Sequence, residues 1–364
     1  MAVPSKALPQ TEQLRAVQVL RAVAAFLVTI AHASEEAKYF FHFTPLFETD
    51  PFGKGVDLFF VISGFIIYYS STKLFNTPHA SKTFIFNRAL RVIPLYYIFT
   101  SLMVVTLVLF PGGIKEAKFD IGHILSSYLF LPYERYDGRI APILSLGWTL
   151  NYEMLFYTLF SLCLFLRGRW IAICAIGSLL LLALAGIFIS PDAPAAFREW
   201  TDGIVLEFGM GIGIALAYER WGKLSGGSLP AALAILVAGF LMLYFLNLPE
   251  KPLAIPRFLS AGVPALMIVG AAVLLMPAAS ERQLPGWLVA LGDSSYSLYL
   301  SHRFVQRPIQ MALTHSGFSR MDGIGGVYVF IAVTTAVIAG HVTYLLIEQP
   351  LLRRMRRLTL SRKA

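Results

Sequence analysis

The chain has 364 residues, of which 57% are hydrophobic and only 14% are charged, and its mean hydropathy is +0.66. A single soluble core of this length needs far fewer apolar residues, so the composition excludes an ordinary soluble protein and indicates a polytopic membrane protein. The net charge of +9 would suit nucleic acid, but the basic residues lie in short loops and in the final "RRMRRLTLSRK", which favours a cytoplasmic membrane surface and no nucleic-acid partner.

About ten segments of roughly 20 apolar residues, the length that crosses a bilayer, follow one another along the chain. They lie near residues 16-33, 56-74, 90-111, 144-166, 170-190, 203-219, 229-247, 259-277, 287-305 and 325-348. An even number places both termini on one side, and assigning them to the cytoplasm leaves more Lys and Arg inside than outside. The sequence predicts one all-α transmembrane domain over 1-364, with a core of about 15-350 and a basic cytoplasmic tail, 351-364.

The first segment, "LRAVAAFLVTIAH", carries Arg21 near one end and His32 at the other. A signal peptide is an alternative, with Lys6 and Arg15 as its basic region, 22-31 as its apolar region and "AHA" as its cleavage site. We favour a retained span because Arg21 abuts the apolar core. In such a helix Arg21 and His32 lie on nearly the same face, about 16 Å apart along the axis, although snorkelling and interfacial roles also fit them.

The second and third spans also contain polar residues that are costly in a bilayer. "GKGVDLFFVISGFIIYY" places Asp57 at the start of the second span and Ser63 in its middle. "FNRALRVIPLYY" places Arg88 and Arg91 three residues apart, hence on one helical face, at the cytoplasmic end of the third. Anchoring by the positive-inside rule is the simpler alternative for this arginine pair.

Three later segments add further ionisable groups. "SLGWTLNYEMLFY" places Glu153 among aromatic residues, "LGDSSYSLYLSHRFV" contains His302, and "LLIEQPLLRRMRR" contains Glu348. Ionisable groups on so many spans would be unfavourable facing lipid, so we expect them to converge on a polar interior cavity.

These blocks, in this order and spacing, resemble those of the type-three membrane acyltransferase family, the polysaccharide O-acyltransferases of bacterial inner membranes. The opening blocks are most similar to exopolysaccharide O-acetyltransferases. The resemblance covers about residues 15 to 350, and one departure is Asn151-Tyr152-Glu153, where many relatives have two acidic or polar residues around the glutamate. It implies transfer of an acyl group, most often from acetyl-CoA, to a sugar hydroxyl of an exported or lipid-linked glycan.

The polar residues can be assigned to this reaction. Coenzyme A brings several phosphates to the cytoplasmic mouth, where Arg88 and Arg91 can bind them, and Arg21 can hold the donor or stabilise developing negative charge. A sugar hydroxyl needs a general base, and histidine is the usual one, so we expect His32 to accept its proton.

A carboxylate can orient the imidazole of the base, and Glu153 or Asp57 can serve. We expect Glu153 to lie deeper in the cavity, and pairing with an arginine for structure is the alternative for Asp57. Ser63 and His302 are expected to line the cavity or contact substrate, with an interfacial role equally open for His302. The spacing of the histidines predicts no metal, and Cys163 and Cys174 are interpreted as packing residues.

A second class of function is open at this point. Buried Arg, His, Asp and Glu are also what a proton-coupled transporter, or a flippase of a glycan or acyl group, needs. The absence of an internal repeat and the assembled motifs favour the enzyme. The sequence does not distinguish acetyl from succinyl or other donors, name the acceptor sugar, or give the oligomeric state.

Overall fold

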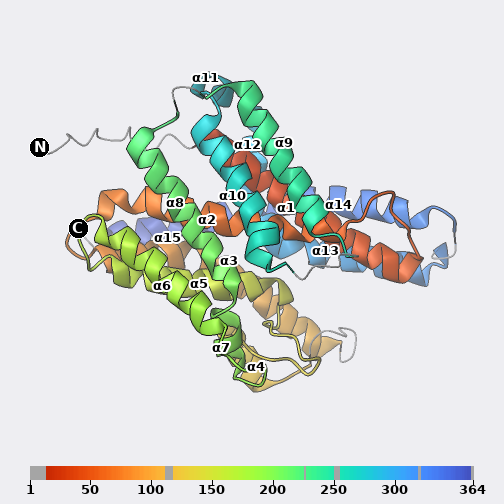
Figure 1. The fold of residues 1–364 in the computed structure, drawn as a ribbon. Helices are drawn as coiled ribbons and strands as arrows, with labels where there is room; N and C mark the ends of the chain where they lie inside the picture. The colour runs from red at the N-terminus through yellow and green to blue at the C-terminus, as the bar shows by residue number, and fades with distance from the viewer. Residues whose placement is uncertain (1–13, 111–117, 225–226, 250–254, 319–320, 362–364) are drawn as a thin grey trace, which may run out of the picture.

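The computed structural model describes residues 14–110, 118–224, 227–249, 255–318 and 321–361. These residues fold into helices, with one isolated β-bridge between Glu134 and Ile140, which confirms the all-α class (Figure 1). The α-helices are α1 Arg15–Phe41, α2 Gly55–Ser71, α3 Ala80–Leu109, α4 Ile121–Tyr128, α5 Trp148–Cys163, α6 Trp170–Gly186, α7 Ala195–Trp200, α8 Leu206–Trp221, α9 Leu229–Leu246, α10 Val263–Gly270, α11 Ala278–Arg282, α12 Gly286–Asp293, α13 Ser295–His315, α14 Ile324–Thr343 and α15 Gln349–Ser361. Single π-helical turns extend α10 on both sides, at Phe258–Gly262 and Ala271–Leu275. A third π-helical turn, Tyr344–Glu348, joins α14 to α15.

Six helical segments among the described residues are long and apolar enough to cross a membrane. They are Arg15–Phe41, Asp50–Leu74, Ala80–Leu109, Leu229–Leu246, Phe258–Leu275 and Ile324–Arg357. Helix α6 is apolar but shorter, and the other expected spans coincide with α5, α8 and the α12–α13 pair, which do not meet the same length and hydropathy criteria. The count of ten therefore stays a prediction. Lys6 of the signal-peptide alternative and the last basic residues, Arg362 and Lys363, lie outside the described residues.

Helix α2 lies inside the bundle, packed against α1, α8 and α10. Glycines bring α2 and α8 together: a Cβ at Gly64 would collide with the carbonyl oxygen of Phe208, and a Cβ at Gly211 with that of Val61. Small residues at a helix crossing allow the backbones to approach closely, which is the usual way that membrane helices associate. This contact fixes the position of Ser63, the neighbour of Gly64.

Apolar side chains face outward from α6, α9 and α14, as in a protein surrounded by lipid. Leu181, Val237 and Phe330 are among the exposed large hydrophobic residues on these helices, whereas Asp57 and His302 are fully buried. Ionisable groups inside and apolar groups outside are typical of a membrane-spanning bundle. Cys163 is buried in the core, as its packing interpretation requires, but Cys174 is exposed, so that interpretation is wrong for Cys174.

The bundle has two ends that matter for the site. Helices α1 and α3 finish, and helices α2 and α5 start, at the same end of the bundle, which we call the distal end. The opposite end is called the proximal end. The segment between α3 and α5 contains the short helix α4. Tyr96 and Tyr97 of α3 donate hydrogen bonds to the carbonyl oxygens of Ser127 and Tyr128, at 3.1 and 2.8 Å, and so attach α4 to the bundle.

Candidate functional site

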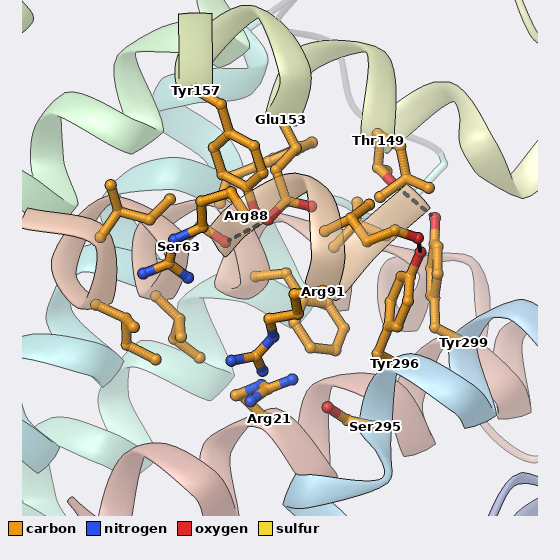
Figure 2. Close-up of a pocket in the computed structure, with 18 residues that line it drawn as sticks. Arg21, Ser63, Arg88, Arg91, Thr149, Glu153, Tyr157, Ser295, Tyr296 and Tyr299 are labelled. Carbon is orange, nitrogen blue, oxygen red and sulfur yellow. Dashed lines mark hydrogen bonds between the residues drawn. The ribbon is translucent and has the colours of Figure 1, made fainter. Parts of the chain in front are cut away.

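A cavity of about 100 Å³ lies between α1, α2, α3, α5 and α13. Ten polar or aromatic side chains that line it are labelled in Figure 2: Arg21, Ser63, Arg88, Arg91, Thr149, Glu153, Tyr157, Ser295, Tyr296 and Tyr299. Five of the eight candidate residues therefore lie in one place, although they come from four helices. The other three, His32, Asp57 and His302, are not among the residues that line this cavity.

Three arginines give the cavity its charge. Arg88 and Arg91 reach it together because they are three residues apart on α3, and Figure 2 shows the guanidinium groups of Arg91 and Arg21 lying next to one another. Arg21 donates a hydrogen bond to Gln18 (3.2 Å), and Arg88 donates one to Ser70 (2.8 Å).

None of the three arginines has a carboxylate within ion-pair distance among the described residues. Glu153 is the carboxylate that lines the same cavity, so three cations face one acidic group there, and the arrangement suits an anionic ligand.

Glu153 supplies the carboxylate of the cavity. Tyr157 lies one helical turn after Glu153 on α5, and its hydroxyl donates a hydrogen bond to Glu153 Oε1. The hydroxyl of Ser63 lies 3.5 Å from the same oxygen, from the opposite wall formed by α2. Both partners are donors, so they fix the direction of the carboxylate.

His32 and His302 form a pair beside the cavity. Their rings are stacked with centroids 5.1 Å apart, and His32 Nδ1 lies 2.9 Å from His302 Nε2. His302 Nδ1 lies 3.1 Å from the carbonyl oxygen of Leu298, which can only accept, so this nitrogen carries the proton of a neutral His302. His302 Nε2 must then accept from His32 Nδ1, which leaves Nε2 of a neutral His32 with a free lone pair.

Tyr299 connects the histidine pair to the cavity that it lines. Its ring lies 6.2 Å from the ring of His302, and its hydroxyl donates to the carbonyl oxygen of Leu146 at 2.9 Å. His302 was expected to line the cavity; it instead lies behind Tyr299, one turn further along α13, fully buried. The carboxylate expected beside His32 is not there either, since Glu153 contacts Ser63 and Tyr157, and the neighbour of His32 is an imidazole.

Asp57 belongs to a different cluster. Arg257, just before the helical segment that contains α10, donates two hydrogen bonds of 2.9 Å to the two oxygens of Asp57. Its guanidinium also lies 5.2 Å from the centre of the Trp148 ring. This bidentate pair, whose carboxylate is buried, fixes the start of α2 against the segment that contains α10. The structural pairing with an arginine that was considered for Asp57 is therefore present. Asp57 does not contact His32, so it is not the carboxylate that orients that imidazole.

Arg257 and most of the aromatic lining of the cavity were not predicted from the sequence. Two signals were available. Ser295, Tyr299 and His302 are spaced by four and three residues, which places them on one helical face, and Tyr157 follows Glu153 by four. Arg257 was harder to identify because it stands at the edge of an apolar segment and its partner, Asp57, is 200 positions away.

Comparisons with known proteins place these features in context. The family model described as "Acyltransferase domain" matches residues 14–345. The exopolysaccharide production protein ExoZ of Rhizobium meliloti (strain 1021) is 35% identical over 311 residues, which cover 83% of this chain and 90% of that protein. No solved structure matches.

Proposed function

The chain belongs to the type-three membrane acyltransferase family, whose domain model covers nearly all of it, and from this premise we propose that it is an O-acetyltransferase of exopolysaccharide production. It moves the acetyl group of acetyl-CoA to a sugar hydroxyl of an exopolysaccharide or of its lipid-linked repeat unit. It acts in a bacterial inner membrane, with the proximal end of the bundle and both termini in the cytoplasm. The observation that carries the proposal is the cavity with three arginines, none of which forms an ion pair with a carboxylate in the described part of the chain.

The arginines suit the phosphates of coenzyme A. Arg88 and Arg91 lie toward the proximal end, where a cytoplasmic donor would arrive, and guanidinium groups bind phosphate through paired hydrogen bonds. Arg21 lies beside Arg91, so it is placed to hold the donor together with Arg91. The distance of about 16 Å along α1 from Arg21 to His32 suits the long pantetheine arm.

His32 is the general base of this proposal. Its free Nε2 takes the proton of the sugar hydroxyl while the hydroxyl oxygen attacks the thioester carbonyl carbon. The carbon–sulfur bond then breaks, the coenzyme A thiolate leaves, and the proton held by His32 passes to that thiolate, so that no net proton is consumed. His302 holds His32 in the required tautomer, a task often given to a carboxylate.

Glu153 and Asp57 have separate tasks. Glu153, fixed by Tyr157 and Ser63, orients groups of the donor or acceptor inside the cavity. Asp57 supports the site from outside it by pairing with Arg257.

Radiolabelled acetyl transfer by the purified protein in nanodiscs tests the proposal. The acceptor is exopolysaccharide from which O-acyl groups have been removed with mild base. Wild type should label the glycan. His32→Ala should lower kcat by about 100-fold or more, because general bases contribute at least that much. Arg91→Ala should raise the KM for acetyl-CoA by about tenfold and regain activity at high donor concentration, because one charge-assisted contact is lost.

Arg169→Ala is the matched control, since Arg169 is an exposed arginine at the proximal end that does not line the cavity. It should behave as wild type. A folded wild-type sample that neither binds nor turns over acetyl-CoA, with acceptor supplied, would refute the enzyme and favour a transporter of a glycan or acyl group.

A further inference from the structure

A second pocket, of about 210 Å³, lies in the segment between α3 and α5, away from the arginine cavity. Its lining residues all come from one short stretch: Lys118, Phe119, Asp120, His123, Tyr133, Arg135 and Tyr136. Because this segment connects the end of α3 to the start of α5, it lies at the distal end of the bundle, opposite to the side from which the donor is proposed to arrive. We call it the distal pocket.

We propose that the distal pocket binds one sugar residue of the acceptor glycan, and this inference rests on the acetyl transfer proposed above. Sugars are bound by aromatic rings that pack on their apolar face together with fixed polar groups for their hydroxyls. Seven lining residues that include three aromatic side chains and four polar or charged ones provide both kinds of group.

The rings are presented on the surface but held in place. Tyr133 stacks on His123 with ring centroids 4.8 Å apart and planes 12° apart, and the Lys118 ammonium lies 4.1 Å from the centre of the Tyr136 ring. Tyr136 is 55% exposed and Phe119 61%, so both rings present apolar area at the pocket that they line. A sugar ring packed on Tyr136 would cover part of this apolar area.

The polar groups are also fixed. The Asp120 carboxylate caps α4 by accepting the backbone N–H of His123 at 2.9 Å, and it accepts the Tyr133 hydroxyl at 3.0 Å. These two contacts lower the pKa of Asp120, so it stays ionised and can accept a sugar hydroxyl. His123 Nε2 donates to the Ala141 carbonyl oxygen (2.8 Å), which leaves Nδ1 of the neutral ring as an acceptor. Arg135 is 94% buried, and its Nε has no hydrogen-bond partner among the described residues.

The segment that carries the pocket is tied to the catalytic region. It ends at Leu146, whose carbonyl oxygen accepts the hydroxyl of Tyr299, the residue that lines the cavity and contacts His302. Glu134 pairs with Arg198 of α7, which holds the other side of the segment. A glycan bound here would therefore be held by a segment that is attached, through Leu146 and Tyr299, to the part of the site that contains the histidine pair.

Steady-state kinetics on three variants test the inference, with de-O-acylated exopolysaccharide as the acceptor. Tyr136→Ala, Lys118→Ala and the double variant remove exposed groups, so folding should be retained. We expect the KM for the glycan to rise, by about tenfold in the double variant, because that factor corresponds to the loss of a few contacts. The KM for acetyl-CoA and its slow hydrolysis without acceptor should not change. Tyr39→Ala is the matched control, since Tyr39 is 67% exposed near the distal end of α1 and lies outside the pocket.

The outcomes separate this inference from the proposed function. An unchanged glycan KM in the double variant, with transfer intact in wild type, would overturn the inference and leave the acetyltransferase standing. If wild type does not use acetyl-CoA, binding of the same glycan to the protein in nanodiscs, measured without donor, decides instead. Binding that the double variant loses and Tyr39→Ala keeps supports the pocket, and absence of binding to wild type overturns it.

Discussion

Two imidazole rings share one hydrogen bond between α1 and α13, and the direction of that bond decides which nitrogen is basic. The Leu298 carbonyl oxygen fixes the proton of His302, and His302 in turn fixes that of His32. A histidine in this arrangement needs no carboxylate to select its tautomer. His302 therefore acts through His32 and is a positioning residue.

Substitution of His302 should show this role. We expect His302→Ala to lower kcat by about tenfold or more, because His32 loses the acceptor that orients it, while the KM for acetyl-CoA is unchanged. His302→Gln keeps an acceptor at a similar reach and should recover most of the activity. Measured kcat and KM for both variants, with the pH profile of kcat, check this. Equal losses in the two variants, or a change only in thermal stability, would indicate a packing role.

The sequence identified single residues better than their partners. Arg88, Arg91 and Glu153 were predicted to share a cavity from the cost of placing them in lipid, and they do line one. The contact between His32 and His302 joins positions 270 residues apart, and no periodicity in either helix predicts it. The pairing of Asp57 with Arg257 spans 200 positions and depends equally on tertiary packing.

Among the elements, the segment with α4 is the one whose stability should respond to pH. His123 is 97% buried, and burial lowers its pKa below the ordinary value of 6.5, although its bond to Ala141 works in the opposite direction. An unfolded segment would bind a proton at about pH 6.5, whereas the folded one resists it. The folded segment is thus favoured above that pH and loses stability as the pH falls below it.

Hydrogen exchange of the α4 amides between pH 5 and 8 measures this effect once the intrinsic exchange rates are corrected for pH. Protection should be constant above about pH 7 and decrease below about pH 6.5. His123→Gln cannot titrate and should show a flat profile. A wild-type profile as flat as that of the variant would contradict the argument.

At the scale of the whole molecule, hydropathy predicted the class of fold, while six segments of the described residues meet the length and hydropathy criteria for a span, against the ten expected. Helices α5, α8 and α13 carry Glu153, Glu207 and His302, so the residues that make the interior polar also lower the hydropathy by which a span is recognised. The same polar residues that the interior needs therefore make these helices harder to recognise as membrane spans from hydropathy. The distal pocket was not predicted at all, because it arises in a connection without apolar periodicity.

The orientation of the bundle can be measured by labelling single cysteines. In a chain with Cys163 and Cys174 replaced by Ser, Asp192→Cys lies between α6 and α7 at the distal end, and Arg169→Cys lies between α5 and α6 at the proximal end. Both positions are exposed. A maleimide that cannot cross the membrane should label only Asp192→Cys in spheroplasts and both variants after lysis. The reverse pattern would place the termini outside.

The cavity arginines have a consequence for how the enzyme behaves in a cell. On the proposed function they bind phosphates, and coenzyme A keeps all its phosphates after it has given up the acetyl group. On the proposed function, the product therefore binds about as well as the donor, and each occupies the site in proportion to its concentration. The rate of glycan modification then follows the ratio of acetyl-CoA to free coenzyme A. The degree of acetylation of the exported polymer would therefore vary with the carbon metabolism of the cell.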